Sequence, residues 1–281
     1  MRRETLVPLL QKVAIYGILV VAVIASVLPL MWAFASSLRP AAETFGYTTP
    51  FTIEAIIPTQ WDLTAYADII EDGFARNVFN SLLISGAVVL GGLFINSLAA
   101  FGFAVFDFRG KRPLYALVLA TFLVSLEVIV VPLFLVVREL GLIDSYAALV
   151  LPALADAFAI FLLTQAFLEV PRDLIDAARV DGSSWFTVYR RVTLPLTRPA
   201  LATAGLFMFI ASWDAFFWPL VATRSAELGV VQLGVNRYIT NSVVLWDRVF
   251  ASSVIASLIV LALFLVLQRF YVRGIALTGL K

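Results

Sequence analysis

The sequence predicts an all-α membrane protein with six transmembrane helices, cytoplasmic N and C termini, and a charged cytoplasmic loop between helices 4 and 5. Three observations support this fold class. Of the 281 residues, 62% are hydrophobic and 14% are charged, whereas a soluble domain is about half apolar and about a quarter charged. Six apolar runs are long enough to cross a bilayer, and the basic residues are shared unequally between the segments that join them.

The six apolar runs are predicted to be the spans, because a helix needs about 20 apolar residues to cross the hydrocarbon core. In chain order they cover residues 13–38, 78–105, 114–137, 146–168, 201–222 and 249–270. The first run is longer than the ~7–15 residues of a signal-peptide core, so it is predicted to remain as a span.

The orientation follows from the basic residues, which are in excess in the cytoplasmic segments of membrane proteins. With the N-terminus inside, 14 of the 20 Lys and Arg residues lie in cytoplasmic segments. This orientation places residues 171–199 in the cytoplasm and residues 39–77 and 223–248 outside. We expect a short helix at 64–70. The outer segments are either ordinary solvated loops or surfaces that meet an external partner.

The composition also excludes several classes of function. The chain contains no cysteine and no histidine, which removes Cys/His metal sites, thiol catalysis and Ser-His dyads. Its net charge is +1, so no overall attraction to nucleic acid is implied.

The charged stretch at residues 171–199 begins like an amphipathic helix. Pro171 suits the first position of a helix, where a missing N–H costs nothing. Leu174, Ile175 and Ala178 then fall on one helical face, and acidic and basic residues surround it. The stretch is too long for a tight turn, so it is predicted to contain a second element.

That second element is predicted to be another short helix. Gly182 breaks the pattern, as a residue that can take positive φ does at a helix end. Ser183 or Ser184 can cap the helix that follows, which carries Trp185 and Phe186. The stretch therefore predicts a bent pair of short helices that exposes apolar and aromatic side chains.

At this loop the chain resembles the permease subunits of bacterial ABC importers of the maltose type, the carbohydrate-uptake branch of the binding-protein-dependent transport system inner membrane components. These permeases carry the pattern E-A-A, three residues, G, nine residues, I-x-L-P. The matching residues here are Asp176, Ala177, Ala178, Gly182, Val192, Leu194 and Pro195. The first position departs, because Asp replaces Glu. Without the resemblance, an amphipathic helix pair resting on the membrane surface fits the same residues.

The resemblance implies that residues 171–199 form the coupling helices, which dock on an ATPase subunit. The residues it assigns to ATPase coupling are Asp176, Ala177, Ala178, Asp181, Gly182, Trp185, Phe186, Leu194 and Pro195. It also implies that residues 1–281 form one transmembrane domain in the bacterial inner membrane. The implied partners are a second homologous permease subunit, two ATP-binding subunits, an extracytoplasmic solute-binding protein and membrane lipid.

The chain is not expected to be an enzyme or to bind a cofactor or metal. Its only Gly-Lys pair, Gly110-Lys111, lacks both the upstream glycine and the following Ser or Thr of a phosphate-binding loop. The resemblance implies that ATP and Mg are used by the partner ATPase.

Three acids lie within the predicted spans, namely Glu127, Asp156 and Asp214. A charge at the centre of a spanning helix costs about 2.5–3.5 kcal/mol on insertion scales, and no Lys or Arg lies at mid-span to offset it. Three acids at similar depth favour a polar cavity along a solute pathway. The alternative is protonated carboxyls that hydrogen-bond between helices.

The fifth run adds aromatic residues next to one of these acids. Asp214, Phe217 and Trp218 are expected to share a helical face, with Trp213 adjacent. A carboxylate beside aromatic rings suits a sugar, because the carboxylate can accept hydrogen bonds from its hydroxyls while the rings cover the C–H face. An interfacial aromatic belt with core packing is the alternative. The run resembles the W-N-x-F-x-x-P-L segment of carbohydrate permeases, with Asp214 in place of Asn.

The sequence therefore favours a permease subunit of an ATP-driven, binding-protein-dependent importer of a mono-, di- or oligosaccharide. A polyol or a glycerol-3-phosphate-type solute is the alternative within this class. A phosphate would want a cationic partner, which the middles of the spans do not offer. Two other classes fit the intramembrane acids less well, a proton-coupled secondary transporter and an intramembrane aspartyl protease that would use Asp156 and Asp214.

Overall fold

The computed structural model describes residues 3–50, 52–58, 61–240 and 243–278. Within these ranges the regular structure is helical, and an isolated antiparallel bridge pairs Ile239 with Val244. The chain divides into two compact units. The first comprises residues 1–74 with 235–257, and the second comprises residues 75–234 with 258–281.

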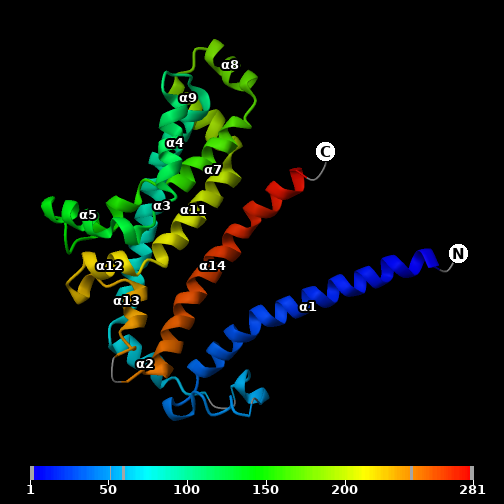
Figure 1. The fold of residues 1–281 in the computed structure, drawn as a ribbon, viewed down its shortest axis with the longest axis vertical. Helices are drawn as coiled ribbons and strands as arrows, with labels where there is room; N and C mark the ends of the chain where they lie inside the picture. Colours follow the sequence, from blue (N-terminus) through cyan, green and yellow to red (C-terminus); the bar gives the residue numbers. More distant parts are fainter. Residues whose placement is uncertain (1–2, 51, 59–60, 241–242, 279–281) are drawn as a thin grey trace. The chain divides into compact units, whose positions relative to one another are not determined.

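In the part of the chain that the structure describes, three long helices are apolar enough to cross a membrane without a break. They are α1 (Arg3–Ser37), α3 (Phe74–Val105) and α14 (Trp246–Thr278), each labelled in Figure 1. Their candidate spans cover Ala14–Ser37, Phe74–Val105 and Trp246–Val266. These helices correspond to the first, second and sixth predicted spans, and they support the predicted fold class.

The third and fourth predicted spans are each broken into two helices. The third consists of α4 (Lys111–Thr121) and α5 (Leu126–Glu139), which are bent by 100°. The fourth begins with α6 (Tyr146–Val150) and the 3₁₀ turn η3 (Leu151–Ala153), and continues, after a bend of 42°, as α7 (Ala157–Leu168). Helix α7 begins where it does because Asp156 caps it, its carboxylate accepting a hydrogen bond from the Ala159 N–H.

The fifth predicted span is also interrupted. Helix α11 (Arg198–Trp213) ends at Asp214, and α12 (Phe217–Ala222) starts after a gap of three residues. Pro219 lies in the first turn of α12, where its missing N–H leaves no intrahelical bond unmade. A short 3₁₀ turn η5 (Ala226–Leu228) and α13 (Val231–Asn236) follow.

The core of the second unit lies between α3, α7 and α11. Small residues allow the close approach, as is usual between helices in lipid. A methyl group at Gly92 would lie 2.1 Å from Met208 Cε of α11 and 3.1 Å from the Leu154 carbonyl oxygen. The buried residues Leu163 and Ala204, from α7 and α11, belong to the same hydrophobic core as Met208.

Gly92→Ala is therefore expected to lower the thermal stability of the protein, because overpacking a close contact costs about 1–3 kcal/mol. Gly86→Ala is the matched control on the same helix, since nothing lies within 4 Å of its added methyl group. Alanine is also the better helix former, by about 1 kcal/mol. Melting temperatures in detergent check this. Equal values for the two variants would contradict the close packing at Gly92.

The first unit contains the outer segment between α1 and α3. The helix expected at 64–70 is present as α2 (Thr64–Glu71), after two short 3₁₀ turns, η1 (Ala41–Glu43) and η2 (Ile53–Ala55). Arg248 in the first turns of α14 contacts two acids, with its Nη2 2.7 Å from Asp68 Oδ2 and its Nη1 2.9 Å from Asp72 Oδ2. This pair of ion pairs joins α2 to α14 within the first unit.

Candidate functional site

The loop between α7 and α11 has the helix pair that the sequence predicts. Helix α8 (Arg172–Val180) ends at Asp181, and Gly182 follows with φ of +82°. The cap of the next helix, α9 (Trp185–Val188), is Ser184, whose Oγ accepts from the Thr187 N–H at 3.2 Å. Figure 1 shows α8 and α9 near the end of the second unit where α4 begins.

The chain returns from α9 to the span through an unusual segment. A π-helical turn, η4 (Tyr189–Thr193), continues into α10 (Leu194–Leu196). The helical stretch Trp185–Leu196 then meets α11 at an angle of 84°. Because π turns inside helices occur often at functional sites, this turn is a candidate segment for movement of the loop relative to the spans.

The outer face of the helix pair presents apolar side chains among acids. Val180 is 88% exposed, Phe186 is 57% exposed and Leu174 is 47% exposed. Of the residues assigned to ATPase coupling, Asp176, Ala177, Asp181, Gly182, Trp185 and Phe186 are exposed, while Ala178, Leu194 and Pro195 are half-buried. Such a surface, apolar with charged neighbours, has the composition of a docking site.

The inner face of the same pair packs on the end of α3. The Trp185 ring lies edge-on to Phe106 with centroids 4.8 Å apart, and the Arg179 guanidinium stacks 4.4 Å above the Trp185 ring centroid. Tyr189 contacts Phe101 edge-on, with centroids 5.4 Å apart. The helix pair is therefore fixed to the membrane helices by aromatic contacts, while its outer face stays open.

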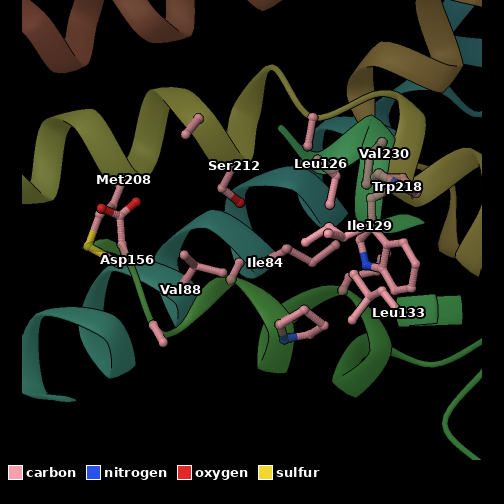
Figure 2. Close-up of a pocket in the computed structure, with 17 residues that line it drawn as sticks. Ile84, Val88, Leu126, Ile129, Leu133, Asp156, Met208, Ser212, Trp218 and Val230 are labelled. Atoms are coloured by element: carbon pink, nitrogen blue, oxygen red, sulfur yellow. The ribbon is translucent and has the colours of Figure 1, made fainter. Parts of the chain in front are cut away.

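A cavity of about 330 Å³ lies in the second unit between α3, α5, α11, α12 and the stretch from α6 through η3 to the N-cap of α7. Most of its lining is apolar, and its polar side chains include Asp156 and Ser212. Figure 2 shows Asp156 beside Met208 at one end of the cavity and the Trp218 ring at the other. The volume lies in the range of about 300–1,000 Å³ typical of ligand pockets.

The polar end of the cavity is organised by the break in the fourth span. Asn96 of α3 donates from Nδ2 to the Leu154 carbonyl oxygen at 3.0 Å and accepts at Oδ1 from the Asp156 N–H at 3.1 Å. Its amide therefore satisfies the backbone groups that the break leaves without helical partners, as the membrane interior requires. Asp156 itself accepts from the Ala159 N–H at 2.7 Å.

The aromatic end is fixed by a hydrogen bond as well. Trp218 is 6% exposed, and its Nε1 donates to the Ala148 carbonyl oxygen at 2.9 Å.

On the outer side, the Asp144 carboxylate accepts from the Ser225 N–H, the Arg224 N–H and the Ser225 hydroxyl at 2.9–3.0 Å. These donors hold the pKa of the Asp144 carboxyl below its usual range. The segment before α6 is thus tied to the segment after α12.

Comparison with known proteins identifies the family. The model of the family described as binding-protein-dependent transport system inner membrane component matches residues 91–275. The chain belongs to this family. It is a multi-pass permease subunit of an ABC importer in the inner membrane, and a separate subunit hydrolyses ATP.

The permease resembles several characterised proteins over most of its length. It is 32% identical over 255 residues to the arabinooligosaccharides transport system permease protein AraQ of Bacillus subtilis, covering 90% of each chain. It is 28% identical to the sn-glycerol-3-phosphate transport system permease protein UgpE of Rhizobium meliloti, covering 92% of this chain and 94% of the relative.

A solved structure shares the fold. One chain of a bacterial ABC transporter involved in the import of the acidic polysaccharide alginate superposes with a TM-score of 0.80, at 22% identity, over 96% of the permease and 98% of that chain. The transport system of this family includes a binding protein by its description, which supports the predicted extracytoplasmic partner.

The cavity of the permease brings together two of the six residues predicted for the solute pathway, Asp156 and Trp218. Glu127 lies in the first turn of α5 and is exposed, next to the lining residue Leu126. Trp213 is 1% exposed and stacks on Phe209 with ring centroids 5.6 Å apart. This arrangement agrees with core packing, the alternative to a role of Trp213 in the solute pathway.

Asp214 and Phe217 lie outside the cavity lining. The expectation that Asp214, Phe217 and Trp218 share one helical face is wrong, because α11 ends at Asp214 and α12 starts at Phe217. Both side chains are exposed, and Asp214 Oδ1 accepts from Gln232 Nε2 at 3.3 Å. The helix break changes the direction of the side chains that follow it.

Sequence reasoning missed Ser212 and the role of Asn96. Ser212 lines the cavity, and its Oγ lies 3.1 Å from Ser85 Oγ of α3. Asn96 is fully buried. The available signal was an amide in the middle of an apolar run, which needs hydrogen-bond partners inside the membrane. Nothing in the local sequence named those partners.

Proposed function

We propose that this permease forms half of the translocation pathway of a sugar importer and that residues 171–199 couple it to the ATPase. The observation that carries the proposal is the cavity, which holds the Asp156 carboxylate at one end and the Trp218 ring at the other. Solute hydroxyls can donate to the carboxylate, and an aromatic ring can cover the C–H face of a sugar. Asp156 and Trp218 are the proposed solute-pathway residues.

The charge of the cavity favours a neutral solute. No Lys or Arg is found among the described residues that line it. Binding of phosphate groups usually relies on such cations, and the Asp156 carboxylate would repel an anion. The names of the relatives include both solute types, arabinooligosaccharides and sn-glycerol-3-phosphate. The lining supports the first, and a polyol remains the alternative within the neutral class.

The surface of the loop supports docking on an ATPase. Val180, Phe186 and Leu174 present apolar area on α8 and α9, and the acids Asp176 and Asp181 lie between them. One coupling loop serves one ATPase site, so the proposed assembly is a pair of homologous permease subunits with two ATP-binding subunits. Together with the binding protein, these subunits would move solute by alternating access.

Uptake by the whole importer, reconstituted in proteoliposomes with its binding protein, tests the proposal. A neutral arabinose-containing oligosaccharide is expected to accumulate when ATP is enclosed, whereas sn-glycerol-3-phosphate is not. Uptake of the phosphate at an equal rate would contradict the assignment of a neutral solute. Permease that transports without an ATPase subunit would contradict the assembly.

A further inference from the structure

A buried hydrogen bond connects the coupling loop to α3. Tyr189 Oη and Ser97 Oγ lie 2.7 Å apart, and the two residues are only 4% and 2% exposed. Tyr189 is the first residue of the π turn that follows α9. Because a buried hydroxyl without a partner is unfavourable, a displacement of this turn is expected to carry α3 with it.

The preceding residue of α3 contacts the polar end of the cavity. Asn96 is bound to the Leu154 carbonyl oxygen and to the Asp156 N–H, at the break between η3 and α7. The Asn96 Nδ2 also lies 3.9 Å from the sulfur of the cavity residue Met208. A displacement of α3 at this level therefore moves the start of α7 and the carboxylate that lines the cavity.

We propose that Tyr189, Ser97 and Asn96 are positioning residues that transmit movement of the coupling loop to the polar end of the cavity. The proposal rests on the proposed docking of that loop on the ATPase. Its physical basis is two sets of hydrogen bonds on adjacent residues of α3, one from Ser97 to the π turn and one from Asn96 to the backbone at the cap of α7. The test therefore measures the coupling between the loop and the cavity directly.

The absence of cysteine from the sequence provides a direct probe. In the assembled importer, Ala155→Cys places the only thiol of this chain in the cavity lining. The rate at which a water-soluble maleimide labels this thiol is measured with and without the non-hydrolysable nucleotide AMP-PNP. Bound nucleotide is expected to change the rate in the parent, and Tyr189→Phe or Ser97→Ala is expected to weaken that response about two- to tenfold, the range that one net hydrogen bond is worth.

A matched control removes a similar hydroxyl elsewhere. Tyr146 donates from its hydroxyl to Asn80 Oδ1 of α3 at 2.8 Å, and Tyr146→Phe is expected to keep the response of the parent. Tyr189→Phe preserves the ring and its contact with Phe101, so it is expected to assemble normally. A merely structural role would lower the melting temperature of the complex and leave the nucleotide response unchanged.

The double variant Ser97→Ala/Tyr189→Phe is expected to respond no worse than either single variant, because both remove the same contact. Additive losses would overturn the proposal, as would single variants that respond like the parent. A parent complex that binds ATPase but shows no nucleotide response at the introduced thiol would overturn it too. Failure of the ATPase to co-purify with the permease would instead contradict the proposed docking.

Discussion

Asp156→Ser is expected to lower solute transport per assembled importer by one to two orders of magnitude. Serine can still cap α7, since its hydroxyl can accept from the Ala159 N–H that the carboxylate now binds at 2.7 Å. The substitution withdraws the charge from the cavity. A hydrogen bond between a charged acceptor and a solute hydroxyl is worth about 1.5–3 kcal/mol, and about 1.4 kcal/mol corresponds to a tenfold change.

The controls separate solute binding from folding. Asp156→Ala also removes the helix cap, so it is expected to lower thermal stability by about 0.5–2 kcal/mol in addition. Asp214→Ser removes an exposed carboxylate at the end of α11, outside the cavity lining, and is expected to transport at close to the parent rate. The measurement is uptake in proteoliposomes, normalised to assembled complex. Normal uptake by Asp156→Ser would remove Asp156 from the solute pathway.

Gly182→Val is expected to uncouple ATP hydrolysis from transport while membrane insertion stays intact. Gly182 adopts φ of +82°, and no atom lies within 4 Å of an added Cβ. The cost therefore arises from the local backbone conformation and not from contact with neighbouring residues. It amounts to about 1–2 kcal/mol for a residue with a Cβ in the left-handed region, and it would distort the angle between α8 and α9. The ratio of ATP hydrolysed to solute transported is expected to rise.

Two comparisons isolate the geometry of this bend. Gly182→Asn is expected to retain most of the coupling, because Asn tolerates the left-handed region. Gly110 has a similar φ of +86° at the cap of α4, also with open space around it. Gly110→Val imposes the same strain on a different loop and is expected to leave the ratio unchanged. Solute-stimulated hydrolysis at the parent ratio in Gly182→Val would contradict the coupling role of the bend.

The pair of short helices α8 and α9 could be predicted because its signals are local. The positive φ of Gly182 and the cap at Ser184 are properties of single residues and their immediate neighbours. The motif spacing then points to the loop as a docking element. The three unbroken spans α1, α3 and α14 were predictable for a similar reason, because the length of an apolar run depends only on the sequence.

The breaks within the spans could not be predicted from hydropathy. The sequence indicates that Asp156 is a charge in mid-span, although it is also a helix cap whose backbone is bound by Asn96 from another helix. Hydropathy does not distinguish one continuous helix from two consecutive helices with a break between them. Because hydropathy does not show the break at Asp214, the prediction placed Asp214 and Phe217 on one face with Trp218, although only Trp218 lines the cavity. The site depends on these breaks, so its residues were predicted only in part.

The broken spans have a consequence for the order in which the protein enters the membrane during synthesis. Helix α4 has 11 residues and α7 has 12, which correspond to about 16–18 Å against a hydrocarbon core of about 30 Å. Neither helix can cross alone, and the exposed backbone at the start of α7 needs a partner inside the bilayer. The partner is Asn96, which binds the Leu154 carbonyl oxygen at that break and lies 58 residues before Leu154 in the chain. The ribosome therefore synthesises the partner first. Helix α3 can then supply hydrogen bonds to the later, interrupted spans as they enter the membrane.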